Sequence, residues 1–179
     1  RNRIKKANNL GMDNQSTATA AVLAAHGISK EVSSPEGTLT ILSDVSFAIE
    51  RGDSVAVVGA SRDRGSLGYA LLHNLILNEF QGPIYPINPN ARFIHSLPCY
   101  PAVGAVPDAV DLAVIMVPKR LVIPVVEECL DHGVRGLVVI SAGFAETGAE
   151  GAELEGRLRD LVRSQRARMI GPNCMGVIN

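Results

Sequence analysis

The sequence contains no tryptophan, and its four phenylalanines and three tyrosines make up only 4% of 179 residues. Because proteins that bind single-stranded nucleic acid stack bases on aromatic rings, this scarcity disfavours such a surface. The formal net charge of −1 does not recommend nucleic acid or an anionic membrane as a partner. No apolar run reaches the length that crosses a bilayer. We therefore expect no nucleic-acid partner and no membrane partner.

Cysteine is also scarce. Cys99, Cys129 and Cys174 are far apart, with no CxxC pair and no histidine cluster beside them. This spacing disfavours a zinc site and a disulfide framework. We expect a cytoplasmic protein without a metal site.

The composition is that of a globular protein, with 46% hydrophobic and 20% charged residues. Residues 1–37 are rich in Asn, Ser, Thr and Ala and are expected to be loose, with a short helix conceivable over Thr17–Ala25. Residues 38–53 predict a short β extension, with strands over Thr38–Leu42 and Val45–Glu50. The second of these alternates apolar and polar positions, which is the period of a strand.

From residue 54 to residue 179, strand and helix patterns alternate. Five short apolar segments predict strands over residues 54–58, 83–88, 112–117, 136–140 and 168–170. Helical spacing predicts helices over residues 66–80, 119–132 and 149–164. Right-handed crossovers between these elements give an α/β fold, a Rossmann-like doubly wound parallel sheet of about five strands. We expect the strand order 3-2-1-4-5, with ligands beyond the carboxyl ends of the strands.

The loop after the first of these strands, Gly59–Gly68, has the composition of a phosphate site. Gly59 permits a tight turn, and Ala60, Ser61 and Arg62 can present backbone N–H groups. Gly65 lies at the start of the following helix, where free N–H groups and the helix dipole favour an anion. The alternative is a glycine-rich turn with only a structural role.

Two familiar phosphate motifs do not fit this loop. A Walker A loop requires a lysine after its last glycine, and Ser66 follows Gly65 here, so NTP hydrolysis is not expected. The dinucleotide fingerprint GxGxxG has Ser61 at its second glycine position. The second strand also lacks the acidic residue that holds an adenine ribose, since it ends in Asn88-Pro89-Asn90. NAD is therefore disfavoured as a ligand.

Five motifs occur in the order and spacing of a known family: VAVVGASRDRGSLGYALLHNL, GPIYPINPNA, DLAVIMVP, GVRGLVVISAGFAE and RMIGPNCMGVIN. Together they resemble the CoA-binding domain of NDP-forming acyl-CoA synthetases, a family similar to the α subunit of succinyl-CoA synthetase. The resemblance spans residues 54–179 and implies coenzyme A as the ligand.

The resemblance implies a role for residues in each motif. The loop that grips the CoA phosphates would hold Gly59, Ala60, Ser61 and Arg62, and Asn88 and Asn90 would lie near the adenosine. The nucleotide would be flanked by Val117 and Pro118, and the pantetheine by Ser141, Ala142 and Gly143, with Glu146 close by. The loop with Asn173 would face the phosphoryl-transfer centre. No catalytic residue is assigned.

Several of these residues have a structural alternative. Val117-Pro118 can simply end a strand and start a helix, since proline is favoured there. Residues 141–143 can form an ordinary turn, and Asn173 can cap a helix. Cys174 has no matched histidine in the sequence that would make it a nucleophile.

A second resemblance covers the segment that leads into the first of these motifs and shares its opening, VAVVGAS. GTLTILSDVSFAIERGDSVAVVGAS resembles the opening of an ABC-transporter ATPase, up to the point where a Walker A loop would follow. The chain therefore has the pattern of a junction between two families.

The sequence predicts the CoA-binding domain of an ADP-forming acyl-CoA synthetase, which binds CoA or acyl-CoA. We expect it to be catalytically incomplete alone, because the phosphohistidine and ATP-grasp domains, or an ATP-grasp subunit, would be needed. The alternatives are a regulatory module that senses CoA or NAD(H), an ABC-type ATPase fragment, and an inactive chimera.

Overall fold

The structure is a computed structural model that describes the backbone of residues 21–34, 37–50 and 52–174 and the side chains of residues 52–174. The chain divides into two compact units, Arg1–Glu50 and Arg51–Asn179.

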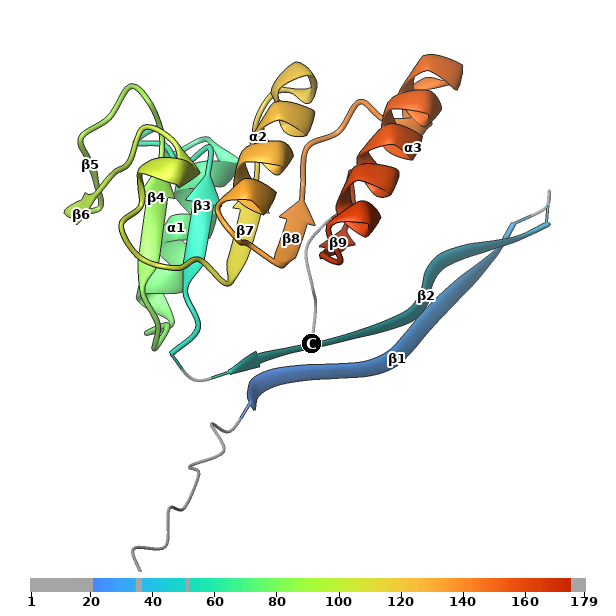
Figure 1. The fold of residues 1–179 in the computed structure, drawn as a ribbon, viewed down its shortest axis with the longest axis horizontal. Coiled ribbons are helices and arrows are strands. Elements are labelled where there is room, and N and C mark those ends of the chain that lie inside the picture. The colour runs from blue at the N-terminus through green and yellow to red at the C-terminus, as the bar shows by residue number, and fades with distance from the viewer. Residues whose placement is uncertain (1–20, 35–36, 51, 175–179) are drawn as a thin grey trace, which may run out of the picture. The chain divides into compact units, whose positions relative to one another are not determined.

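The first unit contains two long antiparallel strands, β1 (Ala21–Ser34) and β2 (Gly37–Glu50), drawn in blue and teal in Figure 1. The two short strands predicted over residues 38–50 are thus one strand. The prediction of a short helix over residues 17–25 is wrong from Ala21 onward, because residues 21–25 belong to β1. The sequence beyond it contains Gly27 and the β-branched Ile28, which disfavour a helix. Residues 17–20 lie outside the described residues, and the domain limits at 37 and 53 stay predictions.

The second unit is built on a five-stranded sheet in which every pair of neighbouring strands is parallel (Figure 1). Its strands, in chain order, are β3 (Val55–Val58), β4 (Ile84–Ile87), β7 (Leu112–Ile115), β8 (Gly136–Val139) and β9 (Arg168–Ile170). A short hairpin, β5 (Phe93–Ile94) and β6 (Leu97–Pro98), and a 3₁₀ turn, η1 (Val103–Ala105), lie between β4 and β7.

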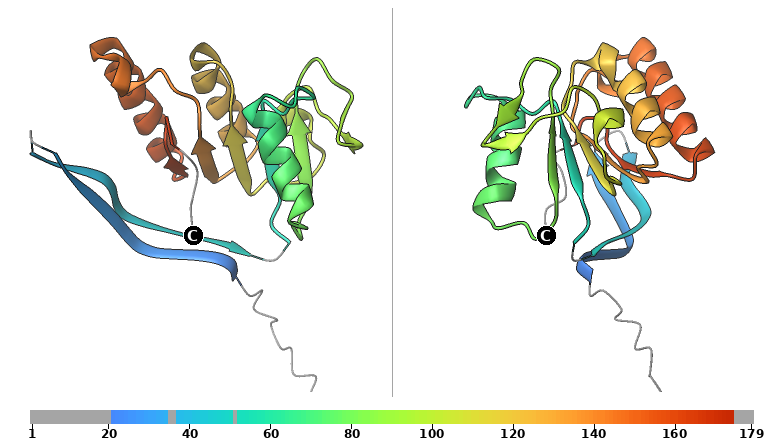
Figure 2. Two further views of the ribbon diagram at one scale, coloured as in Figure 1. Left: turned by 180° about the vertical axis from the view of Figure 1, so that it is seen from behind. Right: turned by 60° about the vertical axis from the view of Figure 1, so that its left-hand side comes forward.

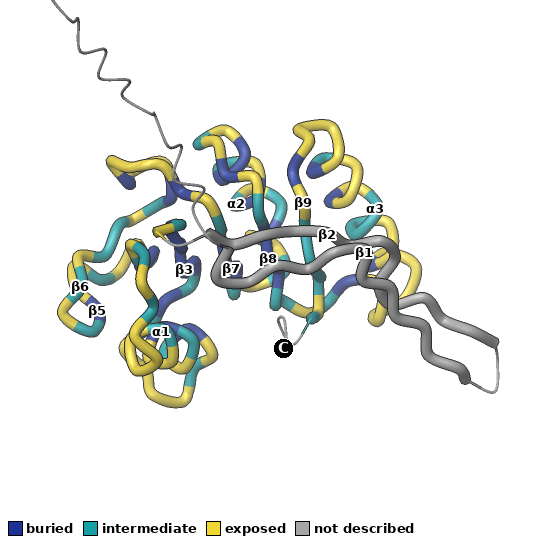
Figure 3. The backbone as a smooth tube through the Cα atoms, turned by 90° about the horizontal axis from the view of Figure 1, so that it is seen from below, coloured by how far each residue is buried: buried dark blue, intermediate teal, exposed yellow. Residues whose placement is uncertain are grey.

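Helices cover both faces of this sheet, which confirms the doubly wound fold. Helix α1 (Leu67–Leu77) packs on one face, and α2 (Lys119–Asp131) and α3 (Ala149–Ser164) pack on the other (Figure 2). Successive residues of a strand point to opposite faces of the sheet. Because helices cover both faces, the residues on both sides of each strand are apolar. In β3, Val57 packs with the α1 cluster and Ala56 with the α2 and α3 cluster. Figure 3 shows the resulting run of buried residues along the central strands.

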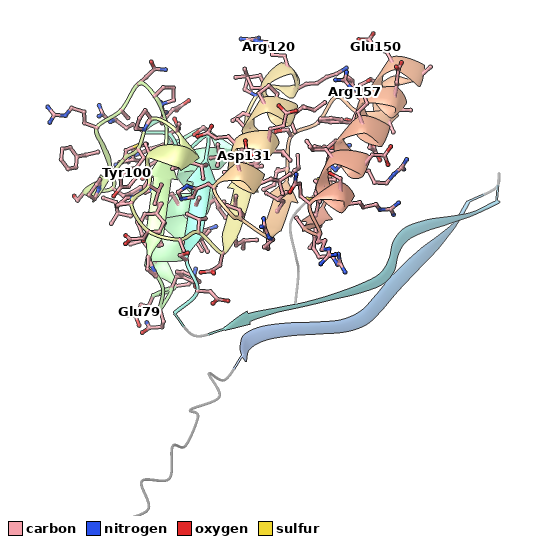
Figure 4. The ribbon with its side chains drawn as sticks, viewed as in Figure 1. Glu79, Tyr100, Arg120, Asp131, Glu150 and Arg157 are labelled. Atoms are coloured by element: carbon pink, nitrogen blue, oxygen red, sulfur yellow. The ribbon has the colours of Figure 1, made fainter. Side chains whose placement is uncertain are left out.

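The predicted strand order of 3-2-1-4-5 is wrong. The observed order is β4-β3-β7-β8-β9, which is 2-1-3-4-5 when the strands of this sheet are numbered along the chain. The outer edge of β4 is already occupied, because Tyr100 donates its N–H to Pro86 and forms a parallel bridge with Ile87 (Figure 4). The third strand, β7, therefore pairs with the free edge of β3. The switch point of the sheet consequently lies between β3 and β7.

A hydrogen-bonded box fixes the register of these two central strands at their amino ends. Asp111 Oδ2 accepts from both the N–H and the hydroxyl of Ser54, each at 2.8 Å, and the N–H of Asp111 donates to Ser54 Oγ at 3.0 Å. Ser54 is buried. The loops at the opposite ends of β3 and β7 are thereby held at a fixed offset.

None of the helices in the described part of the chain is long and apolar enough to span a membrane.

Candidate functional site

The predicted site residues lie in five loops, one after each strand of the parallel sheet. Because the strands are parallel, all five loops lie at the same, carboxyl edge of the sheet. Helices α2 and α3 begin at this edge, where Figure 4 labels Arg120 and Glu150. The structure therefore brings together at one edge the segments that the sequence analysis had selected separately.

The loop between β3 and α1 is organised by its own side chains. Ser61 Oγ accepts from the N–H of Asp63, and Asp63 Oδ1 accepts from the N–H of Gly65, both at 3.0 Å. Ser66 is the N-cap of α1, since its hydroxyl accepts from the N–H of Tyr69 at 3.1 Å. The N–H groups of Gly65 and Ser66, which were expected to face a ligand, are both bonded to Asp63 in this structure.

Other N–H groups of this loop remain available. Among the described residues, nothing accepts a hydrogen bond from the backbone N–H of Ser61, Arg62, Arg64, Leu67 or Gly68. The last two open α1, where the helix dipole also favours an anion. The loop therefore presents a set of unpartnered donors next to a helix N-terminus, which is the arrangement that binds phosphate in many proteins.

Two glycines let the backbone of this loop pack tightly. Gly59 has a φ of +93°, and a Cβ on it would collide with the carbonyl oxygen of Met116 at the end of β7. A Cβ on Gly68 would collide with the carbonyl oxygen of Gly59. The start of α1, the loop and the end of β7 are therefore in direct backbone contact.

Arg62 is a cation of this loop whose side chain is held by a neighbouring segment. Its Nε donates to the carbonyl oxygen of Phe93 in β5 at 3.1 Å, which connects the loop to the hairpin. Its side chain is exposed and forms no ion pair within residues 52–174. The remaining guanidinium nitrogens are thus free to donate to an anion.

Asn88, after β4, contacts the phosphate loop directly. Its Nδ2 donates to the carbonyl oxygen of Ala60 at 2.7 Å, and its Oδ1 accepts from the N–H of Asn90 at 2.8 Å. Ala60 is fully buried, and its own N–H donates to Val57 at 3.3 Å. Asn90 is exposed. Asn88 and Ala60 therefore hold the loop in shape, and Asn90 faces outward.

The loops after β7 and β8 are joined by one serine. The hydroxyl of Ser141 donates to the carbonyl oxygen of Val117 at 2.6 Å and accepts from the N–H of Val117 at 3.1 Å. Pro118 is the N-cap of α2 and is exposed. Asn173, after β9, donates its N–H to the carbonyl oxygen of Ser141 at 3.0 Å. Ser141 thus ties three neighbouring loops together.

In the turn between β8 and α3, backbone N–H groups donate hydrogen bonds to the carboxylate of Glu146. The N–H of Gly143 donates to Glu146 Oε1, and the N–H of Phe144 donates to Glu146 Oε2 at 3.1 Å. These N–H groups, the N–H of Glu146 itself and the nearby Lys119 hold the pKa of Glu146 below its usual range. Ala142, between this turn and Ser141, is exposed.

A hollow of about 470 Å³ lies elsewhere on the second unit, and none of the predicted site residues line it. Its walls come from η1 and the outer side of α2: Gly104, Pro124, Glu127, Glu128, Asp131 and His132. In the described part of the chain, no three His, Cys, Asp or Glu side chains are grouped so that they could hold a metal ion. The carboxyl-edge loops are therefore the better candidate for the site.

Sequence reasoning did not single out two residues that shape the site, Asp63 and Tyr100. Asp63 stands two residues before a glycine, a spacing that favours a side-chain-to-backbone turn and could have identified it. The position of Tyr100 depends on a long connection with no periodic pattern, and no sequence signal indicates it.

Comparison with known families gives one domain match. The model of the CoA binding domain family matches residues 53–179, which is most of the chain and includes all five loops. The match begins at residue 53, within the segment that resembles an ABC-transporter ATPase, and it does not test that second resemblance, which stays a prediction.

The chain is also similar to known ligases. It is 47% identical over 126 residues to the ADP-forming acetate–CoA ligase II of Archaeoglobus fulgidus, covering 70% of this chain and 19% of the ligase. It is 43% identical over 126 residues to the α subunit of the ADP-forming acetate–CoA ligase II of Pyrococcus furiosus, with 70% and 27% covered. The chain thus spans between about a fifth and a quarter of the length of these curated relatives.

A solved structure shows the same fold. The dinucleotide forming acetyl-coenzyme A synthetase 1 of Ca. Korarchaeum cryptofilum, determined with phosphate and ADP, matches with a TM-score of 0.67 and 45% identity. The match covers 69% of this chain and 26% of that protein.

Proposed function

The chain belongs to the CoA-binding domain family, and we propose that it binds coenzyme A along the carboxyl edge of its parallel sheet. The observation that carries this proposal is the set of unpartnered N–H groups after β3, at Ser61, Arg62 and Arg64. They lie at the switch point of the sheet, where ligands of doubly wound folds bind.

The pyrophosphate of CoA suits this loop. Backbone N–H donors, the N-terminus of α1 and the guanidinium of Arg62 all favour negative charge, and no carboxylate is described as paired with Arg62. The carboxylate of Asp63 opposes this attraction in part, because it keeps its negative charge while its Oδ1 accepts from the N–H of Gly65. The loop has no lysine to reach a γ-phosphate, which separates it from ATP-hydrolysing loops.

The order of the strands gives the ligand a direction. The loop with Asn88 and Asn90 lies at one end of the edge, the phosphate loop comes next, and the loops with Ser141 and Asn173 lie at the other end. We place the adenosine toward Asn90 and the pantetheine toward Val117, Pro118 and residues 141–143. With strands about 4.8 Å apart, the five loops extend over about 19 Å, which suits an elongated ligand.

We further propose that the chain supplies the CoA site of an ADP-forming acyl-CoA synthetase. This rests on its similarity to ADP-forming acetate–CoA ligases, of which it spans only a part. The acyl phosphate and phosphohistidine steps that the family resemblance implies would need residues of the other ligase domains. No residue of this chain is assigned a catalytic role.

Calorimetric titration of the chain with CoA, NAD⁺ and magnesium ATP tests the proposal. We expect saturable binding of CoA alone, weakened by Arg62→Ala. Arg157→Ala removes an equal charge from the exposed side of α3 (Figure 4) and should leave the affinity unchanged. Tighter binding of NAD⁺ would favour a sensor, and tighter binding of magnesium ATP would favour an ATPase fragment. Binding of none of the three by folded protein would remove the ligand assignment.

A further inference from the structure

Both polar atoms of the Asn88 carboxamide form a hydrogen bond within the protein. Its donor, Nδ2, goes to the carbonyl oxygen of Ala60 at 2.7 Å, and its acceptor, Oδ1, takes the N–H of Asn90 at 2.8 Å. Its own backbone N–H donates to the carbonyl oxygen of Tyr100 at 2.9 Å. Two of the four hydrogen bonds that a carboxamide can form are thus made within the protein, and they fix the orientation of a side chain that the family resemblance had placed near the adenosine.

The bond to Ala60 determines where the next N–H group points. The Ala60 carbonyl and the Ser61 N–H belong to one planar peptide unit, and the bond between these residues is trans. In a trans unit the C=O and the N–H point in opposite directions. Because the carbonyl oxygen of Ala60 points at Asn88, the N–H of Ser61 points away from Asn88, and no described residue accepts from it.

The surroundings make this orientation firm. Ala60 is 0% exposed and Asn88 is half-buried, so water competes little for the bond between them. The peptide unit is also held from the preceding side, since the N–H of Gly59 donates to the carbonyl oxygen of Ile87 at 3.1 Å. Ile87 and Asn88, at the end of β4, thus form hydrogen bonds with the consecutive loop residues Gly59 and Ala60.

We propose that Asn88 is a positioning residue that aims the N–H of Ser61 at the ligand phosphate and does not itself touch the ligand. The role requires a donor at Nδ2, which a carboxylate of the same shape lacks. This inference rests on the proposed CoA site for the identity of the ligand. Its geometric part, the orientation of the Ala60–Ser61 peptide, can be tested without any ligand.

Asn88→Asp is the most informative variant. It keeps the acceptor for Asn90 but sets a carboxylate oxygen against the carbonyl oxygen of Ala60, so the peptide should turn. We expect the ¹⁵N–¹H signal of Ser61 to shift and its hydrogen exchange to change in the ligand-free protein. CoA affinity should fall by about tenfold, the usual effect of losing one partly buried hydrogen bond. Asn88→Ala should act in the same direction.

Asn74→Ala is the matched control. Asn74 is exposed on α1, and its carboxamide forms no hydrogen bond with the described residues. It should change neither the Ser61 signal nor the affinity. If Asn88→Ala fails to fold, Asn88→Asp carries the test, because it preserves the size of the side chain and the turn to Asn90.

The outcomes separate the two proposals. A CoA affinity that falls in Asn88→Ala, which adds no charge beside the phosphate loop, while the ligand-free Ser61 signal stays in place would make Asn88 a direct ligand contact and overturn the inference. A shifted Ser61 signal in a protein whose wild-type form binds no CoA would support the positioning geometry and overturn the proposed ligand. An unchanged signal together with unchanged affinity would overturn the inference while leaving the CoA site intact.

Discussion

The hydroxyl of Ser141 hydrogen-bonds both polar groups of the Val117 backbone, its carbonyl oxygen at 2.6 Å and its N–H at 3.1 Å. The two residues follow neighbouring parallel strands, so this single side chain sets the distance between the loops after β7 and β8. Both loops belong to the proposed CoA site.

Ser141→Ala should destabilise the protein. The change leaves a half-buried N–H and C=O of Val117 without their partner, which costs about 1–3 kcal/mol. Urea unfolding measures this free energy directly. Ser164→Ala, which removes an exposed hydroxyl bonded to Leu161 at the end of α3, is the control and should cost less than about 0.5 kcal/mol. Equal effects of the two substitutions would contradict the role of Ser141.

Gly59 and Gly133 form a matched pair for the tight packing at the switch point. Both have a φ of +93°, but a Cβ on Gly59 would strike Met116, whereas a Cβ on Gly133 would meet nothing within 4 Å. Gly133→Ala should cost only the conformational term of about 1–2 kcal/mol. Gly59→Ala should cost clearly more in thermal or urea unfolding, and similar losses for the two variants would show that the loop can move away from β7.

The carboxylate of Glu146 should make stability depend on pH in the acid range. Its pKa is lowered in the folded protein, first by the N–H of Gly143, so the unfolded chain binds a proton more readily. Stability from this group is therefore complete above the ordinary pKa of a glutamate. It is lost as the pH falls through the lower pKa of the folded state. In urea unfolding at a series of pH values, the free energy of unfolding should fall less steeply with decreasing pH for Glu146→Gln than for the wild type.

Glu127→Gln provides the comparison for this experiment. Glu127 is exposed on α2, and its carboxylate accepts no hydrogen bond from any residue between 52 and 174. The substitution should leave the fall with decreasing pH as steep as in the wild type. An equally shallow fall in both variants would mean that Glu146 is not the group responsible.

Cys129 should resist alkylation in the folded protein. It is fully buried in α2, and burial, with a smaller contribution from Glu128, raises the pKa of its thiol to about 12. Mass spectrometry after iodoacetamide treatment at pH 8 should find Cys129 unmodified until the protein is unfolded in urea. Modification of Cys129 in the native protein as fast as in urea would contradict its burial.

Much of the fold follows from local patterns in the sequence. The helix predicted over residues 149–164 and the strand over 168–170 have the observed bounds, and the other helices and strands of the sheet differ by at most a few residues at each end. The strand order does not follow from such patterns. It depends on Tyr100 occupying the outer edge of β4, a contact between segments that no local period connects.

The site shows the same division. The motifs indicate which five loops belong to it, because each follows an apolar strand. The hydrogen bonds that join one loop to another connect residues more than twenty positions apart, such as Asn88 with Ala60 and Ser141 with Val117. Sequence spacing could not distinguish these residues from ligand contacts, since asparagine and serine serve both purposes.

We propose that the unpartnered N–H groups after β3 bind the phosphates of CoA. Titrating ¹⁵N-labelled protein with CoA while recording ¹⁵N–¹H spectra tests it most directly. We expect the largest saturable shifts at Ser61, Arg62 and Arg64, with smaller shifts in the loops after β4, β7 and β8. Saturable shifts confined to other regions, such as the hollow beside Glu128 and His132, or no shifts at all, would contradict it.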